Sequence, residues 1–185
     1  MLATAGMVAK RRREGSCMIK VVIVEDDLMI ADTAKETLVE HGYEVCGIAR
    51  TVTEAVVLCR RRKPDLAVID LRLDDRGLAD GWLGTDVVAR LSSMGGLGVL
   101  YASGNLTSAM MTVIGGHACL AKPYSSADLV RGLEIVAEIV ATGTASPPFP
   151  RGFQALRRQP LHLARPRFQV DPQVGAPPRR EANRR

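Results

Sequence analysis

Between residues 18 and 142, five short apolar runs alternate with segments long enough to form helices. The first run, Ile19–Val24, is continuous and rich in β-branched residues, which is typical of a strand buried on both faces. The other four runs are Val45–Ala49, Leu66–Ile69, Val99–Ala102 and Ala118–Ala121. Strands separated by helices pair in parallel through right-handed crossovers. The pattern therefore predicts an α/β fold, a three-layer, doubly wound (βα)5 parallel sheet.

Helix signals fill the gaps between the predicted strands. The first helix should end at Gly42, and the second should be capped by Thr53 and ended by Pro64. The other expected helices lie around residues 85–91, around residues 108–114, and from Ser125 or Ser126 onwards. Each predicted strand is thus followed by a helix, as the doubly wound fold requires.

The net charge of +5 is unevenly distributed along the chain. Four basic residues against Glu14 give residues 1–17 a charge of +3, and nine arginines against two acids give residues 143–185 a charge of +7. Residues 18–142 therefore have a net charge of −5. Because the basic character belongs to the two ends of the chain, it is weak evidence for nucleic-acid binding, and we expect no nucleic-acid partner.

The sequence divides into three predicted parts. Residues 1–17 have no apolar periodicity, and either form a flexible basic extension or precede a true start at Met18. Residues 18–142 form the predicted domain. Residues 143–185 contain eight of the ten prolines and little periodic apolar content, which predicts a disordered Pro/Arg-rich tail.

The cysteine pattern and the hydropathy bear on location. The four cysteines are scattered without a CxxC pair, which favours a reducing compartment. No apolar run approaches the roughly 20 residues of a membrane span, and the order of charge at the N-terminus does not fit a signal peptide. We therefore expect a cytoplasmic protein with no membrane partner.

Polar residues follow four of the five predicted strands. They are Glu25-Asp26-Asp27, Asp70, Ser103 and Lys122-Pro123. With a strand order of 2-1-3-4-5, ligands bind beyond the carboxyl ends of the strands, where that order reverses. Crowded carboxylates are best balanced by a cation, and their hard oxygens favour Mg²⁺. Any one of these residues alone fits a solvated loop, a turn-capping hydroxyl or a surface lysine, but together they predict a site for a metal ion and a phosphoryl group.

Four stretches resemble the receiver domain of two-component response regulators. They are IKVVIVEDD (19–27), PDLAVIDLRL (64–73), VLYASGN (99–105) and ACLAKPY (118–124). The resemblance covers about residues 18–142 and implies a flavodoxin-like sheet. It also implies a single-domain response regulator, phosphorylated by a sensor histidine kinase or a phosphotransfer protein. Such a protein is not an enzyme beyond its own phosphorylation and dephosphorylation.

The resemblance implies a role for each acidic residue of the site. Asp70 matches the phosphoacceptor, and Asp26 matches a direct ligand of Mg²⁺. Glu25 matches the acid that holds a metal-bound water, and the backbone carbonyl of Arg72 completes the protein's contacts with the metal ion. Asp27 is then a neighbour at the start of the first helix, where a negative charge suits the helix dipole.

The resemblance also assigns the phosphoryl-binding residues and the switch. Ser103 and Lys122 match the groups that bind the phosphoryl oxygens, and Lys122-Pro123 matches a cis peptide bond. Ser103 is also a switch position. The second switch position, three residues before the lysine, is usually aromatic but is Cys119 here, so the usual coupling is in doubt. Tyr101 is a possible substitute.

The output of the predicted receiver is less defined than its site. The loop over residues 72–81 is longer than usual, and Arg72 and Asn105 occupy positions that tune hydrolysis. A downstream protein is expected on the face built from the helix near 108–114, the strand 118–121 and the last helix, and a homodimer is possible. The alternative is a pseudo-receiver that binds a partner without phosphorylation. An enzyme of the haloacid dehalogenase type would need a DxDx(T/V) motif, which Glu25-Asp26-Asp27-Leu28 does not supply.

Overall fold

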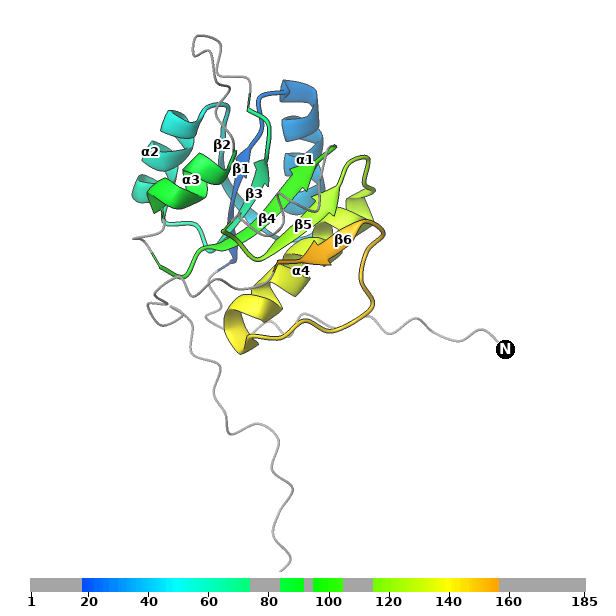
Figure 1. The fold of residues 1–185 in the computed structure, drawn as a ribbon. Coiled ribbons are helices and arrows are strands. Elements are labelled where there is room, and N and C mark those ends of the chain that lie inside the picture. Colours follow the sequence, from blue (N-terminus) through cyan, green and yellow to red (C-terminus); the bar gives the residue numbers. More distant parts are fainter. Residues whose placement is uncertain (1–17, 74–83, 92–94, 105–114, 157–185) are drawn as a thin grey trace, which may run out of the picture.

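The structure of the protein, a computed structural model, describes residues 18–73, 84–91, 95–104 and 115–156. These residues form a six-stranded sheet flanked by helices (Figure 1). The strands are β1 (Lys20–Val24), β2 (Glu44–Ala49), β3 (Leu66–Asp70), β4 (Gly98–Ser103), β5 (Ala118–Ala121) and β6 (Phe153–Ala155). Their order is β2-β1-β3-β4-β5-β6, and the first five are parallel. The predicted parallel sheet of order 2-1-3-4-5 is therefore confirmed.

Two hydrophobic clusters cover the two faces of the sheet. Because side chains alternate along a strand, Val22 and Val24 of β1 join one cluster while Val21 and Ile23 join the other. The first cluster includes buried residues of α2 (Val52–Arg62) and α3 (Gly84–Leu91). The second includes buried residues of α1 (Leu28–Glu40) and α4 (Ser126–Thr142). This arrangement confirms the three-layer α/β fold.

Side-chain caps determine where three of the helices begin. Asp27 caps α1, and Ser125, one of the two start residues predicted for the last helix, caps α4 with a capping box. The predicted cap of α2 at Thr53 is wrong. Thr51 has the extended backbone of a cap, and its hydroxyl accepts the amide N–H of Glu54 at 3.2 Å. Thr53 therefore lies within the helix.

The ordered fold extends beyond the predicted boundary at residue 142. Residues 143–156 turn back from α4 and end in β6, which pairs antiparallel with β5. Leu156 is buried in the first hydrophobic cluster. The expectation that disorder begins at residue 143 is therefore wrong for residues 143–156, whereas residues 157–185 lie outside the described part of the chain.

Several other expectations concern residues outside the described ranges. They include residues 1–17, the helix near 108–114, Asn105 and most of the loop after Asp70. Among the described cysteines, Cys46, Cys59 and Cys119 are free thiols, as their spacing predicts. Within the ranges that the structure describes, no helix combines the length and apolarity that crossing a bilayer requires.

Candidate functional site

The carboxyl ends of four parallel strands bring the predicted site residues to one edge of the sheet. Asp70 is the last residue of β3 and Ser103 is the last residue of β4. Glu25 directly follows β1, and Lys122 directly follows β5. Backbone bonds continue the sheet to these positions, because the Lys122 amide donates to the Ser103 carbonyl at 2.9 Å. The site thus lies where the strand order reverses between β1 and β3.

Three acidic side chains meet at this edge. Glu25, Asp26 and Asp70 each offer a carboxylate oxygen, and these oxygens lie within 4.8 Å of one another. Glu25 is 5% exposed, and the other two residues are half-buried. Carboxylates this close repel one another, and hard oxygen donors of this kind suit a small divalent cation. The donor set therefore fits a metal ion.

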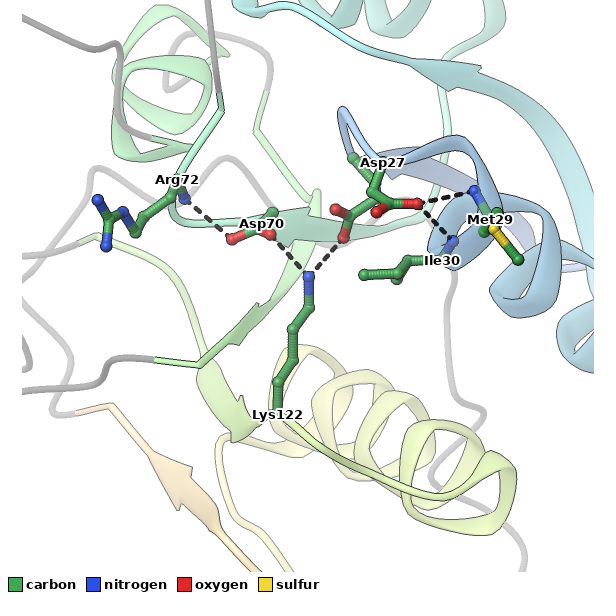
Figure 2. A network of polar contacts seen from close by, with 7 residues as sticks. Asp27, Met29, Ile30, Asp70, Arg72 and Lys122 are labelled. Carbon is green, nitrogen blue, oxygen red and sulfur yellow. Dashed lines mark hydrogen bonds and ion pairs between the residues drawn. The ribbon is translucent and has the colours of Figure 1, made fainter.

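Lys122 crosses the edge of the sheet to contact two of these acids. Its Nζ donates to Glu25 Oε2 and to Asp70 Oδ2, each at 2.7 Å (Figure 2). The sequence predicts a phosphoryl-binding role for Lys122 but does not predict its ion pair with Glu25. These contacts put one positive charge between two negative ones and offset part of their repulsion.

The local environment shifts the pKa values of both partners. Burial raises the pKa of the Glu25 carboxyl above its usual range, although the Lys122 ammonium opposes that shift. Burial alone would lower the pKa of Lys122, but hydrogen bonds to Asp70 and Glu25 outweigh it and raise that pKa. Lys122 is therefore a cation at neutral pH, and its charge favours the ionised form of Glu25.

The remaining predicted residues lie around this cluster. Asp70 Oδ1 accepts the amide N–H of Arg72 at 2.9 Å, and the Ser103 side chain is buried beside the site at the end of β4. Lys122-Pro123 is a cis peptide bond, as the motif predicts. Asp27 faces away from the acids, because its carboxylate caps the first turn of α1 (Figure 2).

Cys119, the predicted second switch position, lies in the core and not at the surface. Cys119 lies in β5 opposite Tyr101 of β4, and both residues are 0% exposed. The Tyr101 hydroxyl donates to the Gly115 carbonyl at 2.7 Å. Burial raises the pKa of the Cys119 thiol to about 12, so the thiol stays protonated at neutral pH. A ring held in this way is part of the core and does not swing freely at the surface.

One residue near the site was missed by the sequence analysis. Tyr124 follows the Lys122-Pro123 bond and lines a groove together with Lys122 and residues of α1. Burial raises the pKa of its hydroxyl, while the charge of Lys122 opposes the shift. Its place in the Lys-Pro-Tyr sequence was the available signal.

A comparison with protein families decides which class of site this is. A model of the response regulator receiver domain matches residues 21–134. The chain belongs to the response regulator receiver family. It is thus a two-component signalling protein, and its acidic residues form the triad typical of the Mg²⁺ site of receivers.

Individual proteins and solved structures are also similar to the chain. The chain is 32% identical over 120 residues to the transcriptional regulatory protein PdtaR of Mycobacterium tuberculosis, covering 63% of this chain and 55% of that protein. The match therefore spans about half the length of that relative. A CheY-like receiver from Methanospirillum hungatei has a TM-score of 0.60 at 23% identity, covering 69% of this chain and 100% of that one. A receiver of a modulated diguanylate cyclase from Desulfovibrio desulfuricans has a TM-score of 0.58 at 25% identity, covering 69% and 100%.

The ion pairs predict a pH-dependent effect of replacing Lys122. In Lys122→Met, burial and the charge of Asp70 act on Glu25 without opposition, so the pKa of Glu25 should rise further. A carboxyl with a raised folded-state pKa stabilises the fold most below its ordinary value of 4.5, and that stabilisation is lost as the pH rises through the folded-state value. The variant should therefore match the parent more closely at low pH and lose about 1–3 kcal/mol at pH 7, the cost of leaving a buried polar group without its partner.

Chemical unfolding across the pH range measures this effect. Lys35→Met, which removes an exposed lysine of α1, is the matched control and should show no pH-dependent loss. A constant difference between Lys122→Met and the parent at every pH would contradict the proposed coupling.

Proposed function

We propose that this receiver accepts a phosphoryl group on Asp70 from a histidine kinase or a phosphotransfer protein, in a Mg²⁺-dependent reaction. The observation that supports this most directly is the placement of Asp70. Its carboxylate belongs to a three-acid cluster and lies 2.7 Å from the Lys122 ammonium. A nucleophile, an acidic cation site and a fixed positive charge are the parts that phosphoryl transfer requires.

In the proposed reaction Asp70 is the nucleophile, and the other side chains of the site bind the phosphoryl group. One Asp70 carboxylate oxygen attacks the phosphorus of a phosphohistidine. The new O–P bond forms as the P–N bond breaks, and the electron pair of that bond returns to the imidazole nitrogen. Lys122 and the Ser103 hydroxyl would bind the phosphoryl oxygens and stabilise the charge that they carry in the transition state.

Four groups would hold the metal ion. Asp26 and Asp70 would supply direct carboxylate ligands, Glu25 would hold a water on the metal ion, and the Arg72 backbone carbonyl would supply a further oxygen. When bound, Mg²⁺ supplies neutralisation of charge on the phosphoryl oxygens. The closeness of the three carboxylates supports this assignment, because they lose mutual repulsion when a cation lies between them.

A groove beside the site supports docking of a protein donor. Its volume is about 490 Å³, and its lining includes Met29, Ile30, Tyr124 and Lys122. Met29 is 81% exposed, and its neighbour Leu28 is 54% exposed. Exposed apolar side chains next to a charged site are typical of interaction surfaces. A donor protein that presents a phosphohistidine to Asp70 would cover this surface.

The mode of output is also part of the proposal. The receiver would signal by protein contact or by passing the phosphoryl group onwards. It would catalyse only its own phosphorylation and dephosphorylation. The expected docking face includes β5, but β6 occupies the outer edge of that strand. A partner would therefore meet residues 143–156 there.

The metal assignment predicts different effects of two adjacent aspartates. Asp26→Asn should weaken Mg²⁺ binding about tenfold or more, because a direct anionic ligand is lost. Asp27→Asn should leave the affinity close to that of the parent, since asparagine is also a good helix cap and Asp27 faces α1. Isothermal titration with Mg²⁺ measures both affinities. Equal losses in the two variants would contradict the assignment of Asp26.

Phosphorylation tests the proposed function itself. The protein is incubated with Mg²⁺ and phosphoramidate, a small donor with a P–N bond. We expect one base-labile phosphate per chain, absent in Asp70→Asn and greatly reduced when the metal is chelated. Asp65→Asn is a matched control, because Asp65 lies before β3 at the opposite end of that strand. No phosphate on the parent protein would overturn the proposal and favour the pseudo-receiver.

A further inference from the structure

Residues 143–156, called here the β6 segment, cover the outer edge of β5. β6 pairs Phe153 with Leu120, Gln154 with Cys119 and Ala155 with Ala118 (Figure 1). Two further backbone bonds extend the ladder at its ends. Ala121 donates to the Gly152 carbonyl at 3.1 Å, and Leu156 donates to the His117 carbonyl at 2.9 Å. The segment is thus bonded along the whole of β5.

Side chains of α4 hold the start of the β6 segment. Arg131 Nε donates to the Pro148 carbonyl at 3.1 Å, and Arg131 Nη2 donates to the Ser146 carbonyl at 2.8 Å. The Glu138 carboxylate accepts the amide and hydroxyl hydrogens of Ser146. These contacts position the turn of the chain that leads into β6.

The end of the segment packs into the core beside the switch position. Leu156 is 8% exposed and belongs to the cluster that contains Tyr101 and Cys119. A Cβ on Gly116 would lie 2.7 Å from the Tyr101 ring and 3.5 Å from Leu156. The space beside Gly116 is therefore filled by Tyr101 and Leu156, and the second of these comes from the β6 segment.

A short path connects the segment to the phosphoacceptor. Ala121 bonds to Gly152, and the next residue is Lys122, whose Nζ contacts Asp70. A Cβ on Gly152 would lie 2.8 Å from the Ala121 Cβ, so the two backbones are packed closely. Because the two residues are in close van der Waals contact, a displacement of Ala121 weakens either its packing against Gly152 or its hydrogen bond to the Gly152 carbonyl.

We propose that the β6 segment responds to the state of Asp70: a phosphoryl group on Asp70 loosens the pairing of residues 152–156 with β5. The inference rests on the proposed function. A phosphoryl group would draw Lys122 and Ser103 towards its oxygens, and these residues stand at the ends of β5 and β4. Movement of Lys122 displaces Ala121, which holds Gly152. Two states of one segment then replace the swing of an aromatic ring, and loosening opens the edge of β5 to pairing with another chain.

Hydrogen exchange with a phosphoryl mimic tests this inference in the full chain. Beryllium fluoride with Mg²⁺ binds a carboxylate oxygen as a tetrahedral mimic of a phosphoryl group, and fluorine NMR detects the bound form. Exchange of the Ala121 and Leu156 amides should accelerate about tenfold when the mimic binds. The Ala55 amide, which bonds to Thr51 at the start of α2, should not change. Asp70→Asn should show neither the fluorine signal nor the acceleration.

Thermodynamic linkage supplies a second test. If binding of the mimic loosens the segment, weakening the segment must tighten binding of the mimic by a corresponding factor. Leu156→Ala removes the buried anchor, and Arg131→Gln weakens the hold on Ser146 and Pro148 without altering the core. Both variants should raise the affinity for beryllium fluoride several-fold. Gln154→Ala, an exposed position of the same strand, should not.

The outcomes separate the two proposals. A bound fluorine signal with unchanged exchange at Ala121 and Leu156 would overturn the role of the β6 segment and leave the phosphoryl site standing. Slower exchange at these amides would overturn it equally, because the segment would then tighten. Absence of the fluorine signal in the parent protein would overturn the proposed function, and the inference that rests on it would fail as well.

Discussion

The mutual repulsion of carboxylates at the edge of a parallel sheet is the constraint around which this protein is organised. Parallel strands bring their carboxyl ends together. Here one carboxylate oxygen from each of Glu25, Asp26 and Asp70 lies within 4.8 Å of the other two. Lys122 reaches over from β5 and bonds two of the three acids at 2.7 Å each. The stability of the edge and the reactivity proposed for Asp70 therefore depend on the same charge, which ties the site to the strand that bears Lys122.

β5, the strand that precedes Lys122, also connects the site to β6, the strand added to the predicted five. β5 is hydrogen-bonded to β4 on one side and to β6 on the other, and Lys122 is the residue that follows it. Cys119 provides no ring in β5, and Leu156 of the β6 segment is buried in the same cluster as Cys119 and Tyr101. The site is thus linked to the carboxyl end of β5 through Lys122, and the β6 segment pairs with the outer side of the same strand.

Much of the sheet could be predicted from the sequence, because strands buried on both faces need continuous apolar runs such as Ile19–Val24. The site residues were predictable because polar groups that end parallel strands must converge. The bond between Lys122 and Glu25 was not, since it depends on how a long side chain crosses the edge. The start predicted for α4 at Ser125 or Ser126 is confirmed, but the predicted cap of α2 is wrong, because Thr51 and Thr53 are equally suited by residue type and only Thr51 has the extended backbone of a cap.

β6 escaped prediction for a different reason. Its three residues lie among prolines and arginines, and a strand this short has no periodicity of its own. It is held by pairing with β5 and by burial of Leu156, which are contacts between residues distant in sequence. Local composition carries no information about contacts between residues distant in sequence, so the composition of residues 143–156 predicts disorder. The same composition remains the basis for the expectation about residues 157–185.

Locating the phosphoryl group on the chain tests whether Asp70 is the phosphoacceptor. Borohydride reduces an aspartyl phosphate to homoserine, and mass spectrometry of the digested protein then identifies the modified position. We expect homoserine at position 70, with Asp26 and Asp27 unchanged. Homoserine at another acidic position, or none at all after treatment with Mg²⁺ and a phosphodonor, would contradict this role of Asp70.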